Sequence, residues 1–477
     1  MKVKTVRTAD RYTKWALALV MVALGFRLIS LGWYPLFDTT EARYGEIARI
    51  MFETQNWVTP FFDYNVPFWG KPPLHTWITS QSFAWFGVGE FTARLPHFAC
   101  SVLVLCMVYR LASRVADTRT AQSAVLVLSS TLGFLIASGM VMTDAALLFA
   151  VTLAMVSFWF AFSESDRLLS GHLFFVGLAL GMLIKGPVAI VLVGIALVCW
   201  SVQQRCFKKA LLALPWPSGL LLFLLLTLPW YLLAELRTPG FLEYFFVGEH
   251  VQRFLVPGWE GDLYGSAHTK PRGTIVWYWL LGAFPWSLAL LGLWLGRGWR
   301  REPLLVERQA HFSAYLMCWM LAPIFLFMMA GNIVPAYVLP GFGGLAVLVA
   351  LNLSLRSLML WVAAGGVSLF ILMIVLFSAG LSSKESQADL LGGDRSFPQH
   401  ARLYYWEKRP FSARFYSKGQ AQLLDDPGEL TKLVNAGEPF YLALPKTAFA
   451  ELHARLAEHC VEQNRDKKRL LLSCHVD

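Results

Sequence analysis

The sequence predicts an all-α polytopic membrane protein with about eleven transmembrane helices, followed by a small α/β domain. Hydrophobic residues make up 56% of the 477 residues and charged residues only 15%, whereas a soluble domain carries about 25% charged residues. Many apolar segments approach the roughly 20 residues that cross a bilayer core of about 30 Å. The 19 Trp and 35 Phe exclude a disordered chain, and seven cysteines are too few for a disulfide scaffold.

Eleven apolar segments are the candidates for transmembrane helices. They lie near residues 15–31, 95–115, 121–137, 145–162, 173–184, 188–202, 211–234, 276–295, 313–329, 337–351 and 358–379. The fifth and sixth are short and are joined by Lys185, Gly186 and Pro187, which leaves open whether they are tilted or cross only part of the bilayer.

Basic residues set the orientation, because short cytoplasmic loops collect Lys and Arg. With the basic N-terminus in the cytoplasm, five further basic positions or clusters fall on the same side: 110–119, 167, 205–209, 297–308 and 356. The net charge of +10 is therefore explained largely by topology, not by a nucleic-acid partner. No small-residue cleavage site follows the first segment, so we predict that this segment is not cleaved.

The C-terminal part reads as a soluble domain on the periplasmic side. We divide the chain into a transmembrane domain, residues 1–383, and a periplasmic α/β domain, residues 384–477. Strands are predicted at 403–406, 440–444 and 470–473, and helices at 427–435 and 446–457. Cys460 and Cys474 both lie in this part, where an oxidising compartment permits a bridge; two free buried thiols are the alternative.

Polar residues on the outer side concentrate in two long loops, residues 32–94 and 235–275, and in the short turn 331–336. Asp144 stands just before the fourth apolar segment. Loops on a rigid scaffold tend to carry function, and ionisable groups at membrane depth are functional candidates. In the first loop, acidic and basic residues between Glu41 and Arg49 have the spacing of a short interfacial helix whose Ile47, Ile50 and Met51 face the bilayer; a purely structural helix is the alternative.

Six motifs stand out within the first 350 residues or so: Asp38–Arg49, Gly70–Pro73, Met142–Asp144, Ile184–Gly186, Tyr244–Phe254 and Pro323–Pro340. Together, and in this order, they resemble the aminoarabinose lipid A transferase family of the bacterial inner membrane, which belongs with the protein O-mannosyltransferase-like glycosyltransferases of the GT-C fold. The C-terminal part adds nothing to the match. The resemblance implies a sugar donor linked to a polyprenyl monophosphate, transfer on the periplasmic face to a lipid or other membrane-proximal acceptor, and inversion at the anomeric carbon. The chain has no Walker A run and no GxGxxG after a strand, so a nucleotide lacks its usual binding loop.

Cations are the expected ligands of the donor phosphate, because fixed charges aimed at developing charge are usually the largest catalytic contribution. The resemblance assigns the carrier phosphate to Lys71 and Tyr44. Arg253 and Lys185 are further candidates. The alternatives are an interfacial snorkelling role for Lys71 and a structural ion pair of Arg253 with Glu249 or another carboxylate.

Three carboxylates are the catalytic candidates: Glu41, Asp144 and Asp38. A hydroxyl acceptor requires a general base, whereas a phosphate acceptor is already anionic, and the sequence does not choose between them. The family has adjacent Asp and Glu before its Arg-Tyr, but this chain has Thr40 and Glu41 there. Either Asp38 replaces the missing carboxylate or Glu41 acts alone.

Tyr337, His250 and Glu249 are predicted to gate the site or to contact substrate. In the family, an acidic residue before the Lys-Pro and a histidine matching His250 form a metal site. Because Gly70 occupies that acidic position, we predict neither a metal nor another cofactor.

The residues thus predict a glycosyltransferase that takes a polyprenyl-phosphate-linked sugar and a lipid or glycan acceptor in the bilayer, with no nucleic-acid partner. The main alternative is a secondary transporter or flippase, which commonly shows repeated halves with paired broken helices; no such internal symmetry is present. A non-catalytic scaffold is a third alternative. The identities of the sugar and the acceptor and the oligomeric state do not follow from the sequence.

Overall fold

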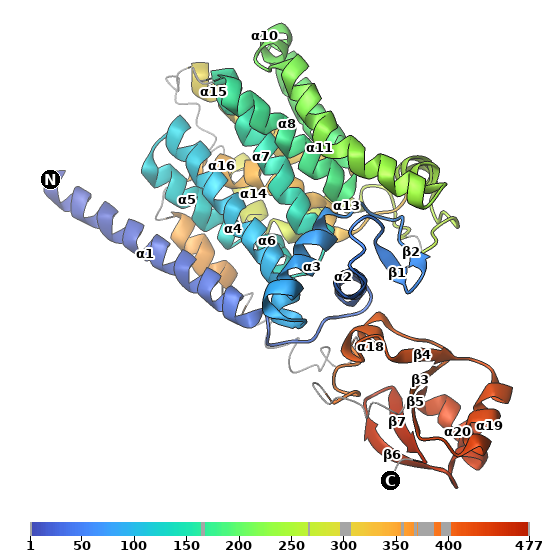
Figure 1. Ribbon diagram of the computed structural model, residues 1–477. Helices are drawn as coiled ribbons and strands as arrows, with labels where there is room; N and C mark the ends of the chain where they lie inside the picture. Colours follow the sequence, from blue (N-terminus) through green and yellow to red (C-terminus); the bar gives the residue numbers. More distant parts are fainter. Residues whose placement is uncertain are drawn as a thin grey trace.

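The computed structural model describes residues 2–163, 167–265, 268–295, 307–353, 357–366, 370, 386–392 and 402–475. Its first part is almost entirely helical (Figure 1). The helices are α1 (Lys2–Ser30), α2 (Thr40–Thr54), α3 (Leu74–Phe86), α4 (Glu90–Val115), α5 (Thr118–Ser129), α6 (Leu132–Ala137), α7 (Thr143–Ser163), α8 (Arg167–Lys185), α9 (Val188–Gln203), α10 (Phe207–Leu212), α11 (Trp216–Arg237), the π-helix η1 (Glu243–Gln252), α12 (Arg253–Leu255), α13 (Thr274–Gly282), α14 (Trp286–Leu295), α15 (Glu307–Phe327), the 3-10 helix η2 (Pro335–Gly341) and α16 (Phe342–Asn352). A short hairpin, β1 (Phe61–Asp63) and β2 (Val66–Pro67), lies between α2 and α3.

Six helical segments in the described part are long and apolar enough to cross a membrane. They are α4, α7, α8, α11, α15 and the continuous segment η2–α16. The pair α13 and α14, bent by 103°, forms a seventh if it counts as one span. The chain is therefore a multi-pass membrane protein.

Two predicted spans are interrupted. The segment 121–137 is divided into α5 and α6, because the hydroxyls of Ser130 and Thr131 donate to the carbonyls of Leu126 and Val127 and end the first helix. The segment 276–295 bends near Pro285, which cannot donate to the helix ladder. The last predicted span, 358–379, lies mostly outside the described residues.

Helix α2 is enclosed by protein instead of lying on the membrane. Ile47, Ile50 and Met51 are almost completely buried, so the prediction that they face the bilayer is wrong. The cause is tertiary: α3 packs against one side of α2, and α18 of the C-terminal part packs against another. A helix with neighbours on several sides buries more than one stripe.

The C-terminal part contains a five-stranded sheet of order β4-β3-β5-β7-β6. Its elements are β3 (Arg402–Trp406), α18 (Phe411–Tyr416), β4 (Ala421–Leu424), α19 (Pro427–Ala436), β5 (Phe440–Pro445), α20 (Lys446–Leu456), β6 (Cys460–Arg465) and β7 (Arg469–Cys474). Strand β3 runs parallel to β4 and β5, whereas β7 runs antiparallel to β5 and β6. The predicted strands and helices coincide with β3, β5, β7, α19 and α20; β4, β6 and α18 were not predicted.

The C-terminal sheet docks on the first loop through α18 (Figure 1). The backbone N–H of Leu36 donates to the Tyr416 hydroxyl at 2.7 Å, and the Phe411 ring lies 5.1 Å from that of Phe62 between centroids. Arg414 lies 3.4 Å from the Asp63 carboxylate. Helix α2 of the first loop therefore lies between α3 and the C-terminal part.

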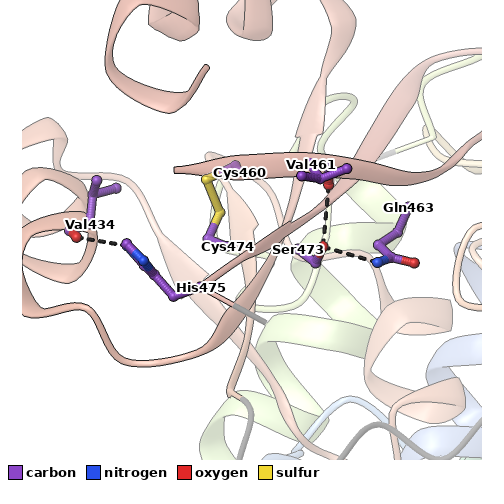
Figure 2. The surroundings of a disulfide bond; sticks show 7 residues. All are labelled: Val434, Cys460, Val461, Gln463, Ser473, Cys474 and His475. Atoms are coloured by element: carbon purple, nitrogen blue, oxygen red, sulfur yellow. Dashed lines mark hydrogen bonds between the residues drawn. A yellow bond between two sulfur atoms is a disulfide. The ribbon is translucent and has the colours of Figure 1, made fainter. Parts of the chain in front are cut away.

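Cys460 and Cys474 form a disulfide at the ends of β6 and β7 (Figure 2), which decides between the two alternatives for these residues. They are register partners in the antiparallel pair. Beside the bridge, Ser473 accepts a hydrogen bond from Gln463 at 3.0 Å, and the His475 ring donates to the carbonyl of Val434 at 2.9 Å. The bridge ties the edge strand β6 to the sheet.

Removing this bridge is expected to destabilise the C-terminal part by about 3 kcal/mol, the chain-entropy value for a loop of this length; the two cysteines are 14 residues apart. The measurement is urea-dependent protease susceptibility of the Cys460→Ser/Cys474→Ser variant. The exposed free thiol Cys199 provides the control, since Cys199→Ser should leave the midpoint unchanged. An unchanged midpoint in the double variant would contradict the expectation.

Candidate active site

The first loop presents Lys71 to the second loop. Lys71 follows Gly70 and precedes two prolines, whose fixed φ angles stiffen the segment. Its ammonium lies 3.0 Å from one carboxylate oxygen of Glu249 and also donates to the carbonyl of Gly70. Its side chain remains partly exposed, so it has room to meet a ligand.

Glu249, on η1, lies between Lys71 and Arg253. The Arg253 guanidinium is 2.8 and 3.0 Å from the two Glu249 oxygens and 3.4 Å from Asp262. Burial alone raises the pKa of Glu249, but Lys71 and Arg253 outweigh it and hold this pKa below its ordinary value. Glu249 is therefore an anion that fixes two cations from separate loops beside each other.

A second ion pair joins α7 and α8. Asp144 is near the start of α7 and Lys185 ends α8. Because the two helices pack side by side in opposite directions, the Lys185 ammonium reaches the Asp144 carboxylate at 2.5 Å. The same ammonium lies 4.5 Å from the centre of the Tyr337 ring, within range of a cation–π interaction.

Tyr337 connects the two ion pairs. The Tyr337 hydroxyl interacts electrostatically with Arg253, Lys71, Asp144 and Glu249. Both ion pairs therefore lie near this one side chain. We define the cation cluster as Lys71, Arg253 and Lys185 with their carboxylates Glu249, Asp262 and Asp144. The three positive and three negative charges balance within the cluster.

His250 links η1 to the turn after α8. One ring nitrogen lies 3.1 Å from the carbonyl oxygen of Lys185 and the other 2.7 Å from that of Phe245. Burial lowers the pKa of His250, and a neutral imidazole donates from one nitrogen only. Both nitrogens face carbonyls, and Gly70 supplies no ligand, so these residues do not fit a metal. Within the described part of the chain, no group of three or more His, Cys, Asp or Glu residues could hold one.

Gly186 allows the turn after α8 to pack closely against η1. Its φ of +87° favours glycine, and a Cβ there would lie 2.6 Å from the Phe245 ring and 2.9 Å from the His250 ring.

Gly186→Ala is therefore expected to destabilise the protein by about 2 kcal/mol and to displace His250. Thermal unfolding in detergent measures the first effect. Gly194→Ala on α9, where a Cβ meets nothing within 4 Å, is the control that should be neutral or slightly stabilising; equal behaviour of the two variants would contradict this account.

Two predicted carboxylates lie outside the cation cluster. Glu41 accepts two hydrogen bonds from Arg94, at 3.0 and 2.9 Å, and one from the backbone N–H of Val141. Asp38 accepts from the backbone and the hydroxyl of Ser412 at the start of α18, and burial raises its pKa. Both therefore join structural elements around the first loop.

Tyr44 lies among aromatic side chains of the first loop: its ring centroid is 4.8 Å from that of His75 and 6.2 Å from that of Phe68. Arg43, which is not among the predicted site residues, lies over the Tyr44 ring at 5.1 Å and donates to the carbonyl of Tyr264 at 3.1 Å. Its position in the Asp38–Arg49 motif was the available signal. Tyr264 itself, whose pKa burial raises to about 12, lies in no motif.

Comparison with known proteins shows which sequences and folds this chain resembles. Residues 12–245 match the family model described as dolichyl-phosphate-mannose-protein mannosyltransferase. Two relatives are named undecaprenyl phosphate-alpha-4-amino-4-deoxy-L-arabinose arabinosyl transferase. The one from Erwinia tasmaniensis is 35% identical over 71% of this chain and 59% of its own length, and the one from Aeromonas hydrophila is 33% identical over 71% and 60%. The chain thus spans about 60% of the length of these curated relatives.

Solved structures show the same fold. ArnT from Cupriavidus metallidurans bound to undecaprenyl phosphate superposes with a TM-score of 0.78 at 20% identity, over 97% of this chain and 98% of that one. The archaeal oligosaccharyltransferase AglB from Archaeoglobus fulgidus gives a TM-score of 0.50 at 13% identity, over 90% and 69%. The resemblance carried by the six motifs is confirmed: the chain is similar in sequence to these arabinosyl transferases and has the fold of ArnT.

Proposed function

We propose that this protein transfers a sugar from a polyprenyl-monophosphate donor to a lipid or other acceptor on the periplasmic face of the bacterial inner membrane, with inversion. The observation that carries the proposal is the cation cluster: Lys71 from the first loop and Arg253 from the second meet on Glu249. The similarity to arabinosyl transferases and to the fold of an ArnT bound to undecaprenyl phosphate supports it.

The topology that suits this function has eleven crossings and a cytoplasmic N-terminus. We count α1, α5–α6, α9 and the segment 358–379 with the spans found by length and composition. This arrangement puts both long loops, the cation cluster and residues 384–477 in the periplasm, and keeps the basic loops inside. Residues 1–383 then form the membrane domain and residues 384–477 the periplasmic α/β domain.

In the proposed reaction the cations stabilise the leaving phosphate. Lys71 and Arg253 contact its oxygens, Lys185 adds charge from the membrane side, and Tyr44 borders the phosphate. Negative charge grows on the phosphate as its bond to the sugar breaks, so cations held in place before the reaction lower the barrier. Glu249 fixes Lys71 and Arg253, while Tyr337 and His250 line the site.

The surroundings of the carboxylates favour an acceptor that is already anionic, such as the phosphate of a lipid A-like molecule. Glu41 and Asp38 are engaged by Arg94 and Ser412, and Asp144 is paired with Lys185. A carboxylate paired with a cation is a weak base, whereas a phosphate oxygen needs no base to attack. We assign Asp144 to orienting Lys185 near the acceptor, and Glu41 and Asp38 to positioning the first loop.

The test begins with mass spectrometry of lipids and glycans from cells with and without the protein, which identifies the added sugar. The purified protein in proteoliposomes should then transfer that sugar from its polyprenyl-phosphate donor, and Asp144→Asn should lower the rate. Movement of the lipid donor across the bilayer without any glycosylated product would instead support a flippase and contradict the proposal.

A further inference from the structure

The helix that carries Arg253 ends where a proline interrupts its hydrogen bonds. A backbone bond from the N–H of Val256 to the carbonyl of Gln252, 2.8 Å long, closes the last helical turn. In a continued helix, the N–H four residues on would donate to the carbonyl of Arg253. That position holds Pro257, which has no N–H. The carbonyls at this helix end must therefore find donors in another segment.

The short turn 331–336 supplies these donors. The side-chain amide of Asn332 donates to the carbonyl of Arg253 at 2.6 Å and to that of Val256 at 3.0 Å. The backbone N–H of Gly331 donates to the carbonyl of Phe254 at 3.0 Å. Two consecutive residues of one turn thus satisfy three carbonyls of the helix end, including that of Arg253 itself.

The surroundings of Asn332 match an asparagine side chain at both of its polar atoms. The side-chain oxygen accepts from the backbone N–H of Gly258 at 3.3 Å and from the Thr269 hydroxyl at 3.4 Å. Two carbonyls face the NH₂ group and two donors face the oxygen, which uses the full bonding capacity of the amide. Asn332 is only 6% exposed. A leucine or an aspartate of similar size would leave some of these buried partners unpaired.

The turn and the helix end are in backbone contact. A Cβ on Gly331 would lie 2.9 Å from the backbone nitrogen of Pro257 and 3.1 Å from its Cα, so only glycine allows this approach. One residue after Asn332, the N–H of Ile333 donates to the carbonyl of His268 at 3.0 Å. The turn therefore holds the second loop at two places.

The same turn runs into η2, which carries Tyr337. The Phe254 ring at the helix end lies 6.4 Å from the Phe327 ring between centroids, and the Phe327 ring lies 4.4 Å from the Tyr337 ring. The Lys185 ammonium lies over that Tyr337 ring. The turn therefore joins the helix end that carries Arg253 to the second ion pair.

We propose that Asn332 is a positioning residue for the donor phosphate and acts through Arg253. By capping the helix that ends there, it fixes the backbone from which the guanidinium reaches into the cation cluster. Without the cap the helix end frays, and the guanidinium must then be ordered when the phosphate binds, which costs affinity. The inference rests on the proposed function, because it takes Arg253 as a ligand of the phosphate.

The test is a double-mutant cycle on the binding of undecaprenyl phosphate, measured by native mass spectrometry of the purified protein in detergent. Arg253→Gln should weaken binding about 30-fold, the loss expected for one hydrogen bond to a charged group. Asn332→Ala should weaken it about tenfold, near the upper cost of ordering one long side chain. Added to Arg253→Gln, Asn332→Ala should weaken binding by less than about twofold more, because the guanidinium that it positions is gone.

Asn352 provides the matched control, because its side chain donates to the carbonyl of Leu348 at 2.8 Å at the end of α16. Asn352→Ala removes the same kind of bond away from the cation cluster and should change binding less than about twofold. Asn332→Ser keeps one hydroxyl donor and goes through the same cycle, with an expected loss of about fivefold. It decides the question where the alanine variant does not fold.

The outcomes separate this inference from the proposed function. A natural chain that binds no undecaprenyl phosphate would contradict the proposed function itself. If the natural chain binds it, the role of Asn332 is overturned by either of two results: the Asn332 variants bind as tightly as the natural chain, or they lose the same factor with and without Arg253. The second result is what a merely structural role predicts, since general destabilisation does not depend on the guanidinium.

Discussion

The Lys71→Met variant is expected to transfer sugar about 100- to 1,000-fold more slowly than the natural chain, the usual loss when one fixed group that stabilises developing charge is removed. Its ammonium is the cation that the first loop places on Glu249, at 3.0 Å. The fold should persist, because Arg253 still neutralises Glu249 at 2.8 Å and methionine keeps the length of the stem. Initial rates in proteoliposomes at saturating acceptor measure the effect.

A matched control separates direct contact from general attraction of an anionic donor. Lys270 is an exposed lysine of the second loop, so Lys270→Met removes the same charge from the same predicted face. Its rate should fall less than fivefold, and high salt should abolish the difference, because exposed charges are screened. If Lys71→Met and Lys270→Met lost the same activity, Lys71 would act only by steering the donor and the proposed phosphate contact would be wrong.

The sequence predicted site features well where the residues concerned are close together in the chain. Lys71 is flanked by Gly70 and two prolines, and Glu249 and Arg253 are one helical turn apart, a spacing that allows an i,i+4 pair. The predicted topology puts both loops on the same side of the membrane, which allows them to meet but does not require it. The Asp144–Lys185 pair was not predicted as a pair, because it depends on how α7 and α8 pack, although each residue was singled out.

Other features depend on contacts between distant segments, which no local pattern specifies. Asp38 reaches Ser412, 374 residues away, because the C-terminal part docks on the first loop. The same docking buries Ile47, which amphipathic spacing alone assigned to the bilayer. Propensity and periodicity describe an element by itself, and tertiary packing then decides which faces are covered.

The buried ion pair between Glu41 and Arg94 allows a test of whether Glu41 positions the first loop or is a catalytic carboxylate. Arg94 is fully buried and Glu41 is 1% exposed. Besides Glu41, the guanidinium donates to the carbonyls of Leu31, Tyr34 and Pro35. These bonds tie the end of α1, the start of α2 and α4 together, so the pair holds the first loop in the position from which Lys71 reaches Glu249.

Glu41→Gln is therefore expected to lower the free energy of unfolding by about 3–5 kcal/mol, since it leaves the charge of Arg94 buried without a counterion. Transfer per folded molecule should stay within a few-fold of the natural rate, because Glu41 lies outside the cation cluster. Glu53→Gln on the same helix is the control: that side chain is 51% exposed beside Arg49, and exposed pairs contribute about 1 kcal/mol or less. Thermal unfolding in detergent and rates normalised to folded protein measure both quantities. A Glu41→Gln variant of natural stability that transfers no sugar would contradict the positioning role and make Glu41 the catalytic carboxylate.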